Sequence, residues 1–191
     1  TEVSENIAKY DEVYAEWSPN EKVAMEVAIG ASQAGTRSMA SMKHVGLNVA
    51  SDPLYTCAYS GVNGGLVVVV ADDPGIYSSQ NEQDTRMVAR AAMVPVIEPS
   101  DSEEARKFTK LAFEYSEKYD TPVILRTTTR LSHSQGVVNP EDRVCPEDKV
   151  YEHNFAKNVM MPMNAKKRHI FVEERLKKMA EDACHMEINT V

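Results

Sequence analysis

Residues 66–71 read LVVVVA, an unbroken apolar run in which four of the six residues are valine. Valine favours strands because its branched β-carbon fits the pleated backbone. A strand with no polar alternation is typical of a parallel sheet, whose connecting helices cover both faces. The run therefore predicts a central parallel strand and, with it, an α/β domain.

The chain on either side of this run alternates between helical and extended patterns. Further strands are predicted at residues 13–17, 36–42, 94–97 and 123–126, and helices at residues 1–10, 18–35, about 84–92 and 101–119. Such alternation favours a three-layer α/β/α fold with a mostly parallel sheet. We expect this domain to span residues 1–140 and to lack its first strand.

Residues 141–191 have a different composition, with several prolines followed by one long charged helix. The apolar residues of this helix, Ile170, Phe171, Leu176 and Met179, form only a narrow strip. The segment is therefore predicted to be a linker and a C-terminal helix that leads toward the next domain. The basic run 166–168 is interpreted as a solvated helix face.

The composition excludes several classes of function. Among 191 residues, 21 Lys and Arg stand against 29 Asp and Glu, a net charge of −8, which argues against nucleic acid or an anionic membrane as partner. Cys57, Cys145 and Cys184 form no C-x-x-C pair, so neither a disulfide framework nor a metal site is indicated. Reduced thiols and the absence of an apolar run of membrane-spanning length favour a cytoplasmic protein.

Glu21 is the strongest candidate for chemistry. It lies at the start of the helix predicted at residues 18–35, where an acidic side chain faces the strand ends. A structural alternative is that Ser18, Pro19 and Glu21 form a capping box, with Ser18 as N-cap and Glu21 as its N3 partner. Ser100 and Glu103 repeat this spacing in the chain, so the pattern alone does not separate a cap from a catalyst.

Ligands of parallel sheets bind at the carboxyl ends of the strands. Besides Glu21, these ends carry the predicted turn Lys43–Gly46, the pair Asp72 and Asp73, and Glu98. The glycines of GVNGG at residues 61–65 match neither phosphate-binding pattern and precede a strand, so they are interpreted as a turn. The five histidines have no metal-ligand spacing, and His44 alone lies at a strand end.

Four blocks together carry a resemblance to a known family: WSPNEKVAMEVAIGASQAGTRSMASMKHVGLNVASDPL, GGLVVVVADDPG, SSQNEQDTR and PVILRTTTRLSHSQG. In this order they closely resemble the pyrimidine-binding domain of indolepyruvate ferredoxin oxidoreductase alpha subunits, a family of thiamine diphosphate-dependent 2-oxoacid:ferredoxin oxidoreductases. The resemblance covers about the first 140 residues. It implies oxidative decarboxylation of indolepyruvate or another arylpyruvate to an acyl-CoA, with reduction of ferredoxin.

The resemblance also implies roles for individual residues. Glu21 falls on the family's activating glutamate, which bonds N1′ of the cofactor's aminopyrimidine and so promotes loss of the thiazolium C2 proton. Lys43, His44, Val45 and Gly46 replace an S-G-P-G turn that lies against the cofactor. Residues expected near the substrate are Asp72 and, from the loop that also holds Ser79 and Glu82, Gln80 and Gln83.

Cofactors and partners follow from the same resemblance. It implies thiamine diphosphate here, and Mg²⁺ and iron–sulfur clusters on a diphosphate-binding domain and a ferredoxin-like domain that this sequence lacks. The implied partners are the 2-oxoacid, coenzyme A, ferredoxin and a beta subunit in an oligomer. We therefore expect a fragment that does not turn over alone. The alternative is a non-catalytic, doubly wound domain that binds a small molecule or assembles subunits.

Overall fold

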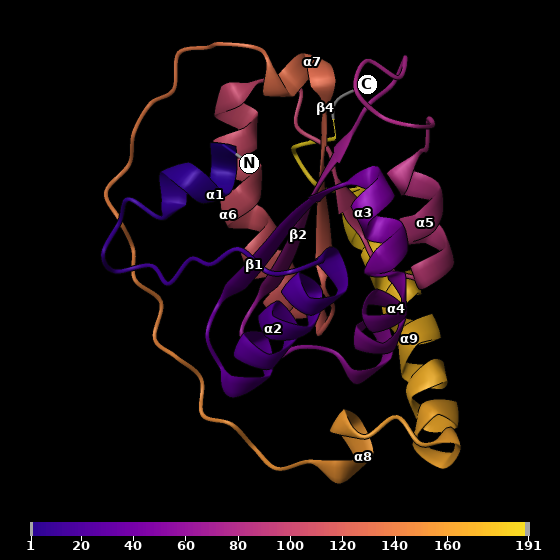
Figure 1. The fold of residues 1–191 in the computed structure, drawn as a ribbon. Coiled ribbons are helices and arrows are strands. Elements are labelled where there is room, and N and C mark those ends of the chain that lie inside the picture. The colour runs from indigo at the N-terminus through magenta and orange to yellow at the C-terminus, as the bar shows by residue number, and fades with distance from the viewer. Residues whose placement is uncertain (1, 190–191) are drawn as a thin grey trace.

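The computed structural model describes residues 2–189, which form an α/β domain around a parallel sheet (Figure 1). Its strands are β1 (Ser38–Lys43), β2 (Leu66–Asp72), β3 (Val96–Ile97) and β4 (Val123–Thr128). They are hydrogen-bonded in the order β1-β2-β4-β3, and every pair is parallel. The predicted central strand is confirmed, because β2 has a neighbour on each side.

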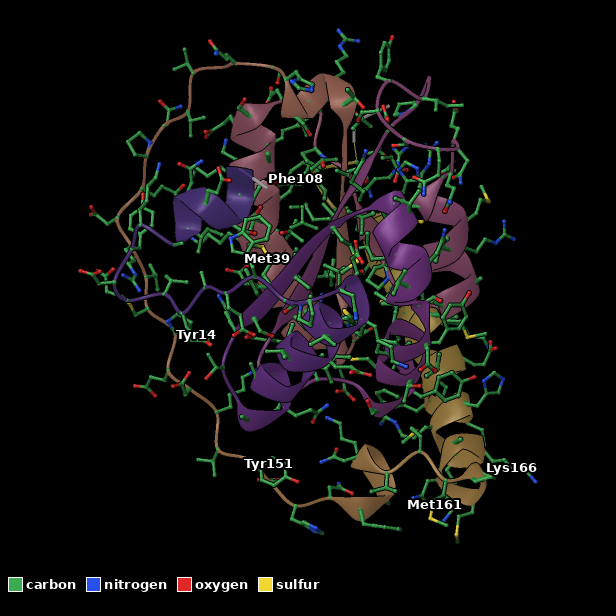
Figure 2. All side chains as sticks on the ribbon, viewed as in Figure 1. Tyr14, Met39, Phe108, Tyr151, Met161 and Lys166 are labelled. Carbon is green, nitrogen blue, oxygen red and sulfur yellow. The ribbon has the colours of Figure 1, made fainter. Side chains whose placement is uncertain are left out.

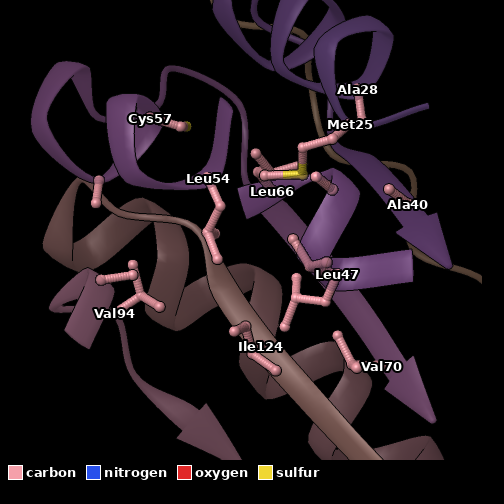
Figure 3. Packing of buried hydrophobic residues seen from close by; sticks show 14 of the residues in the cluster. Met25, Ala28, Ala40, Leu47, Leu54, Cys57, Leu66, Val70, Val94 and Ile124 are labelled. Atoms are coloured by element: carbon pink, nitrogen blue, oxygen red, sulfur yellow. The ribbon is translucent and has the colours of Figure 1, made fainter. Parts of the chain in front are cut away.

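The side chains of β2 alternate between two cores. Leu66, Val68 and Val70 are fully buried in one cluster, which Figure 3 shows around Met25 and Leu54. Val67 faces the opposite cluster. Because the side chains of a strand alternate between its two faces, each face of the sheet carries its own apolar layer.

Helices cover both faces, which confirms the predicted three-layer arrangement. The first face is covered by α2 (Glu21–Ala34), α3 (His44–Val49), α4 (Ser51–Ser60) and α5 (Thr85–Ala92). On the second face, Phe108 of α6 (Ser102–Tyr119) packs in one cluster with Met39 of β1 (Figure 2). The remaining helices are α1 (Glu2–Ile7), α7 (Thr129–Ser132), α8 (Phe155–Asn158) and α9 (Pro162–Ala183). Among residues 2–189, no helix is long and apolar enough to cross a membrane.

The strand predicted at residues 13–17 is wrong. The segment is neither helix nor strand and pairs with no strand among residues 2–189, and its aromatic side chains are exposed, Tyr14 by 83% and Trp17 by 66% (Figure 2). A strand needs a neighbouring backbone for its N–H and C=O groups. The apolar composition of this segment is therefore not evidence of sheet pairing. The helix predicted at residues 1–10 is shorter in the structure, where α1 ends at Ile7, and Thr1 lies outside the described residues.

The structural alternative for Glu21, a capping box with Ser18 as N-cap, is not formed. Asn20 is the N-cap of α2, and its side-chain oxygen accepts a hydrogen bond of 3.0 Å from the backbone N–H of Val23. Glu21 is consequently the first residue of the helix rather than its third. The other end agrees with the prediction, because Gly35 ends α2 with φ at 111°, a conformation that glycine adopts without steric cost.

The same shift applies to the second predicted capping box. The N-cap of α6 is Asp101, whose carboxylate accepts a hydrogen bond of 2.8 Å from the backbone N–H of Glu104. In both helices a short polar side chain lies closer to the first turn than the serine does. Asn and Asp are at least as good as Ser at this position, so each displaces the serine as cap.

Helix α9 packs on the domain described above. Val172 and Met179 are buried, and Met179 lies in the cluster of Tyr115 from α6. Arg175, also buried, donates hydrogen bonds to the backbone carbonyls of Asp120 and Ala58. The buried face of α9 is therefore partly cationic, which the narrow apolar strip did not indicate. Whether residues 141–191 also lead to a further domain stays a prediction.

The basic run at residues 166–168 is only partly solvated. Lys166 and Lys167 are exposed. The Arg168 side chain, however, is 14% exposed and forms an ion pair of 2.9 Å with Asp120. Asp120 also forms an ion pair of 2.8 Å with Lys157 and accepts a hydrogen bond from the backbone N–H of Val62. Arg168 therefore fixes α9 to the loop between α6 and β4, so a solvated face was the wrong interpretation for this residue.

Candidate active site

The start of α2 places Glu21 at the carboxyl edge of the sheet. Helix α2 turns back at Gly35 and leads into β1, so it runs antiparallel to the strands and begins where they end. The Glu21 side chain lies against Gly46 of α3. A β-carbon added at Gly46 would lie 2.6 Å from Glu21 Cγ and 2.7 Å from Glu21 Oε1. The glutamate can therefore take this position only because residue 46 is a glycine.

The Glu21 carboxylate accepts no hydrogen bond and forms no ion pair within the described range 2–189. It is nevertheless half-buried. Its neighbour Lys22 is paired with Asp52 at 2.8 Å and so does not neutralise it. A carboxylate that is partly withdrawn from water without a protein donor loses hydration and gains no bond in return. This arrangement suits a ligand that brings its own donor.

The sequence predicted a turn at Lys43–Gly46, and this prediction is wrong. Strand β1 ends at Lys43, and helix α3 begins directly at His44. Lys43 Nζ donates to the backbone oxygen of Ser78 at 2.8 Å and to its hydroxyl at 3.1 Å. His44 is 1% exposed, and its Nε2 lies 3.1 Å from the backbone oxygen of Asn81. Both side chains thus contact the loop after β2.

Asp72 lies in a buried ionic network. Its carboxylate accepts hydrogen bonds from the backbone N–H and the hydroxyl of Thr85 and from Arg126 Nε at 2.7 Å. Arg126 also pairs with Glu98. The Asp72 side chain is fully buried and the Arg126 side chain is 7% exposed. Direct contact between Asp72 and a substrate is therefore not supported by this arrangement, although the residue lies at the strand end as expected.

Asp73 organises the loop that follows β2. Its carboxylate accepts hydrogen bonds from the backbone N–H groups of Ser78 and Tyr77 and from the hydroxyls of Ser79 and Thr129. The bond from the Ser78 N–H, followed by that from the Ser79 hydroxyl, holds the pKa of Asp73 well below its usual range. The carboxylate therefore stays ionised at neutral pH and anchors the loop.

The two glutamines predicted near the substrate lie in this loop. Gln80 is exposed, and Gln83 donates to the side-chain oxygen of Asn81 at 2.7 Å. Glu82 accepts a hydrogen bond of 2.9 Å from the backbone N–H of Gly75. Glu82 and Gln83 thus stabilise the loop itself, while the exposed Gln80 leaves its amide available to a ligand.

The structure divides the predicted site residues into two groups. Glu21 and Gly46 touch directly, and Lys43 and His44 join them to the loop. Asp72 and Glu98 belong instead to the network around Arg126, which the sequence prediction missed. No group of three or more His, Cys, Asp or Glu side chains among the described residues is arranged to hold a metal ion.

Comparison with known proteins places the chain in context. The family model described as pyruvate flavodoxin/ferredoxin oxidoreductase, thiamine diphosphate-binding, matches residues 1–189. A relative named indolepyruvate oxidoreductase subunit IorA, from Pyrococcus horikoshii, is 50% identical over 188 residues, which is 95% of this chain and 29% of the relative. Its namesake from Methanothermobacter thermautotrophicus is 47% identical over 190 residues, 99% of this chain and 31% of the relative. The chain therefore spans about three-tenths of the length of these relatives.

A solved structure has the same fold. The 2-oxoglutarate:ferredoxin oxidoreductase from Magnetococcus marinus superimposes with a TM-score of 0.70, over 94% of this chain and 40% of that one. The sequence identity is 16%, so the likeness concerns the fold alone.

Proposed function

The chain belongs to the thiamine diphosphate-binding part of the pyruvate flavodoxin/ferredoxin oxidoreductase family, and from this premise we propose that it supplies the pyrimidine-binding half of a 2-oxoacid:ferredoxin oxidoreductase site. The proposed reaction is oxidative decarboxylation of indolepyruvate or another arylpyruvate to an acyl-CoA, with reduction of ferredoxin. The relatives named for indolepyruvate support this choice of substrate. The observation that carries the proposal is the Glu21 carboxylate, which is half-buried and has no hydrogen-bond or ion-pair partner among residues 2–189.

Glu21 has the properties required to hold an aminopyrimidine ring. The carboxylate stands at the carboxyl edge of the sheet, accepts no hydrogen bond from the part of the chain that the structure describes, and is held in place by contact with Gly46. We propose that it bonds to the ring nitrogen N1′ and shares a proton with it. When bound, thiamine diphosphate supplies the carbon nucleophile that the side chains of this chain lack. The role of Glu21 is then to place and stabilise a proton at N1′.

The other predicted contacts are proposed at different levels of detail. The backbone of residues 43–46 borders the position of the Glu21 carboxylate and is proposed to line the pyrimidine site. Gln80, and less directly Gln83, is proposed to approach the 2-oxoacid. Asp72 is left out of direct contact, because Thr85 and Arg126 already occupy its oxygens.

The remaining components are proposed to belong to other parts of the assembly. These are Mg²⁺, the diphosphate-binding domain, the iron–sulfur clusters and a beta subunit, with coenzyme A and ferredoxin as reactants in a cytoplasmic oligomer. The fraction of the relatives that this chain spans is consistent with such a division.

Reconstitution tests the proposed function. The full-length protein and its partner subunit are mixed with thiamine diphosphate, Mg²⁺, coenzyme A and ferredoxin, and ferredoxin reduction is followed with indolepyruvate, phenylpyruvate, pyruvate and 2-oxoglutarate. Reduction that requires thiamine diphosphate and favours the aryl oxoacids is expected. An assembly that binds the cofactor but reduces ferredoxin with none of these oxoacids would favour the non-catalytic alternative.

Gly46→Ala is expected to inactivate the assembled enzyme by displacing Glu21. The new methyl group would lie 2.6–2.9 Å from three side-chain atoms of Glu21, and a flexible glutamate moves away at little cost. We expect turnover to fall by about 10-fold or more, since misplacing a catalytic group is costly. Stability should change by less than about 1 kcal/mol, because alanine also improves helix propensity. Turnover assays and urea unfolding measure the two effects.

The matched control for this substitution is Gly30→Ala in α2. A β-carbon at Gly30 would have no atom within 4 Å, so turnover should remain at the wild-type level. If Gly46→Ala were as active as Gly30→Ala, the contact between Gly46 and Glu21 would not be needed for turnover.

Residues 1–191 alone are expected to bind thiamine diphosphate only weakly. Charged contacts to the metal and diphosphate contribute much of the affinity for such a ligand, and we place these contacts outside this chain. Isothermal titration calorimetry with Mg²⁺ is expected to give no micromolar binding. Micromolar affinity would contradict the proposed division of the site.

A further inference from the structure

The loop at residues 74–84 lies beyond the carboxyl end of β2, next to α3 and α5 (Figure 1). Its backbone is in an uncommon conformation, with φ at 88° for Gly75 and 56° for Ile76. A β-branched residue with positive φ is strained and persists only where its surroundings hold it. The hydrogen bonds to Asp73 described above supply part of that restraint. Glu82 adds a hydrogen bond to the Gly75 N–H within the loop, and further restraint comes from outside the loop.

Two consecutive side chains at the junction of β1 and α3 supply this outside restraint. Lys43 Nζ donates both of its hydrogen bonds to Ser78, and His44 Nε2 bonds to the backbone oxygen of Asn81. A carbonyl oxygen only accepts, so Nε2 carries the proton. His44 Nδ1 is then an acceptor that has no partner among residues 2–189. The His44 imidazole thus binds the loop through one of its two ring nitrogens.

The same junction carries Gly46, against which Glu21 lies. One short segment therefore fixes the Glu21 carboxylate through its glycine and the loop through its first two side chains. We propose that Lys43 and His44 are positioning residues, which hold the 74–84 loop at the sheet edge that carries Glu21 and do not contact the cofactor with their side chains. This inference rests on the proposed function, in which the loop presents Gln80 to the 2-oxoacid.

The proposal predicts which kinetic constant changes. If a variant releases the loop, only a fraction of the molecules hold it in the binding position at any moment. The apparent affinity for the oxoacid falls by that fraction, while substrate at saturation restores the position. The KM for the oxoacid should therefore rise. The kcat should stay unchanged, because Glu21 itself stays in place.

Hydrogen exchange tests the restraint without reference to activity. In the full-length protein without cofactor, the amides of residues 75–78, each hydrogen-bonded to Asp73 or Glu82, are compared among variants. Lys43→Met and His44→Leu remove the donors and are expected to accelerate exchange by about 3- to 10-fold, the effect of losing one net hydrogen bond. Lys43→Arg and His44→Gln keep a donor and are expected to preserve slow exchange. Unchanged exchange in Lys43→Met would overturn the proposal.

Lys118→Met provides a matched control. Lys118 forms an ion pair of 2.8 Å with Asp182, on α6 and α9, and its loss should leave exchange at residues 75–78 unchanged. If His44→Leu fails to fold, the two Lys43 variants still test the proposal. Lys43 lies nearer the surface than the buried His44, so its substitution disturbs the core less.

Steady-state kinetics of the assembled enzyme complete the test. Lys43→Met is expected to raise the KM for the oxoacid by about 3- to 10-fold with kcat within twofold of wild type, and Lys43→Arg to restore KM. A fall in kcat at unchanged KM would overturn the positioning role. Normal turnover in Glu21→Gln would instead overturn the proposed function, and the exchange result for the loop would be unaffected.

Discussion

Glu21→Gln is expected to lower the turnover number of the assembled enzyme by about 10²- to 10⁴-fold, the usual contribution of a positioned acid–base group. The amide has nearly the same shape, so the contact with Gly46 is retained. It has no charge and cannot share a proton with N1′. Ferredoxin reduction at saturating oxoacid and thiamine diphosphate is the measurement, with circular dichroism to show that the fold is intact.

Asn20→Ala separates catalysis from helix capping at the same helix start. Loss of the cap bond to Val23 should destabilise the protein by about 1 kcal/mol. It leaves the Glu21 carboxylate in place, so turnover of the folded enzyme should stay near the wild-type value. If Glu21→Gln remained within about threefold of wild type, the carboxylate would not be the activating group.

Arg126→Met is expected to destabilise the protein by about 3–5 kcal/mol, the cost of leaving a buried charge without its partner. Asp72, whose side chain is fully buried, would keep its two bonds from Thr85 and lose the one ion pair that it forms among residues 2–189. Glu98 would lose its close partner as well. Urea unfolding, with the slope checked against wild type, measures the change.

Two further variants separate charge burial from other effects. Asp72→Asn combined with Arg126→Met removes both charges and should recover much of the loss, because an amide oxygen still accepts from Thr85. Lys22→Met breaks an ion pair in which both side chains are exposed, and it should cost less than about 1 kcal/mol. A similarly small cost for Arg126→Met would show that its network is hydrated rather than buried.

The sequence predicted the sheet well because its strongest signal is local. The valines of residues 66–71 must be covered on both faces wherever they lie, and the two apolar clusters on either side of β2 reflect this directly. The prediction of residues 13–17 as a strand failed for the opposite reason. A short apolar and aromatic run shows that a segment can form a strand, whereas the presence of a free neighbouring strand is a property of the whole fold.

The site was predicted less completely, because distant residues decide which way a side chain faces. The local sequence around an acidic residue at a strand end is the same whether its carboxylate binds a ligand or pairs with an arginine. Asp72 meets Arg126, which stands one strand away in the sheet. An arginine that ends the apolar run VILR was the available signal. The position of Glu21 beside Gly46 agrees with the prediction that it lies next to residues 43–46.

The central claim is that Glu21 activates the C2 proton of thiamine diphosphate in the assembled enzyme. Hydrogen–deuterium exchange at C2 of the bound cofactor, followed by proton NMR after rapid quenching, tests this step without oxoacid or ferredoxin. Wild type is expected to exchange this proton about 10²-fold or more faster than Glu21→Gln. Equal exchange rates in the two proteins, both with the cofactor fully bound, would contradict the claim.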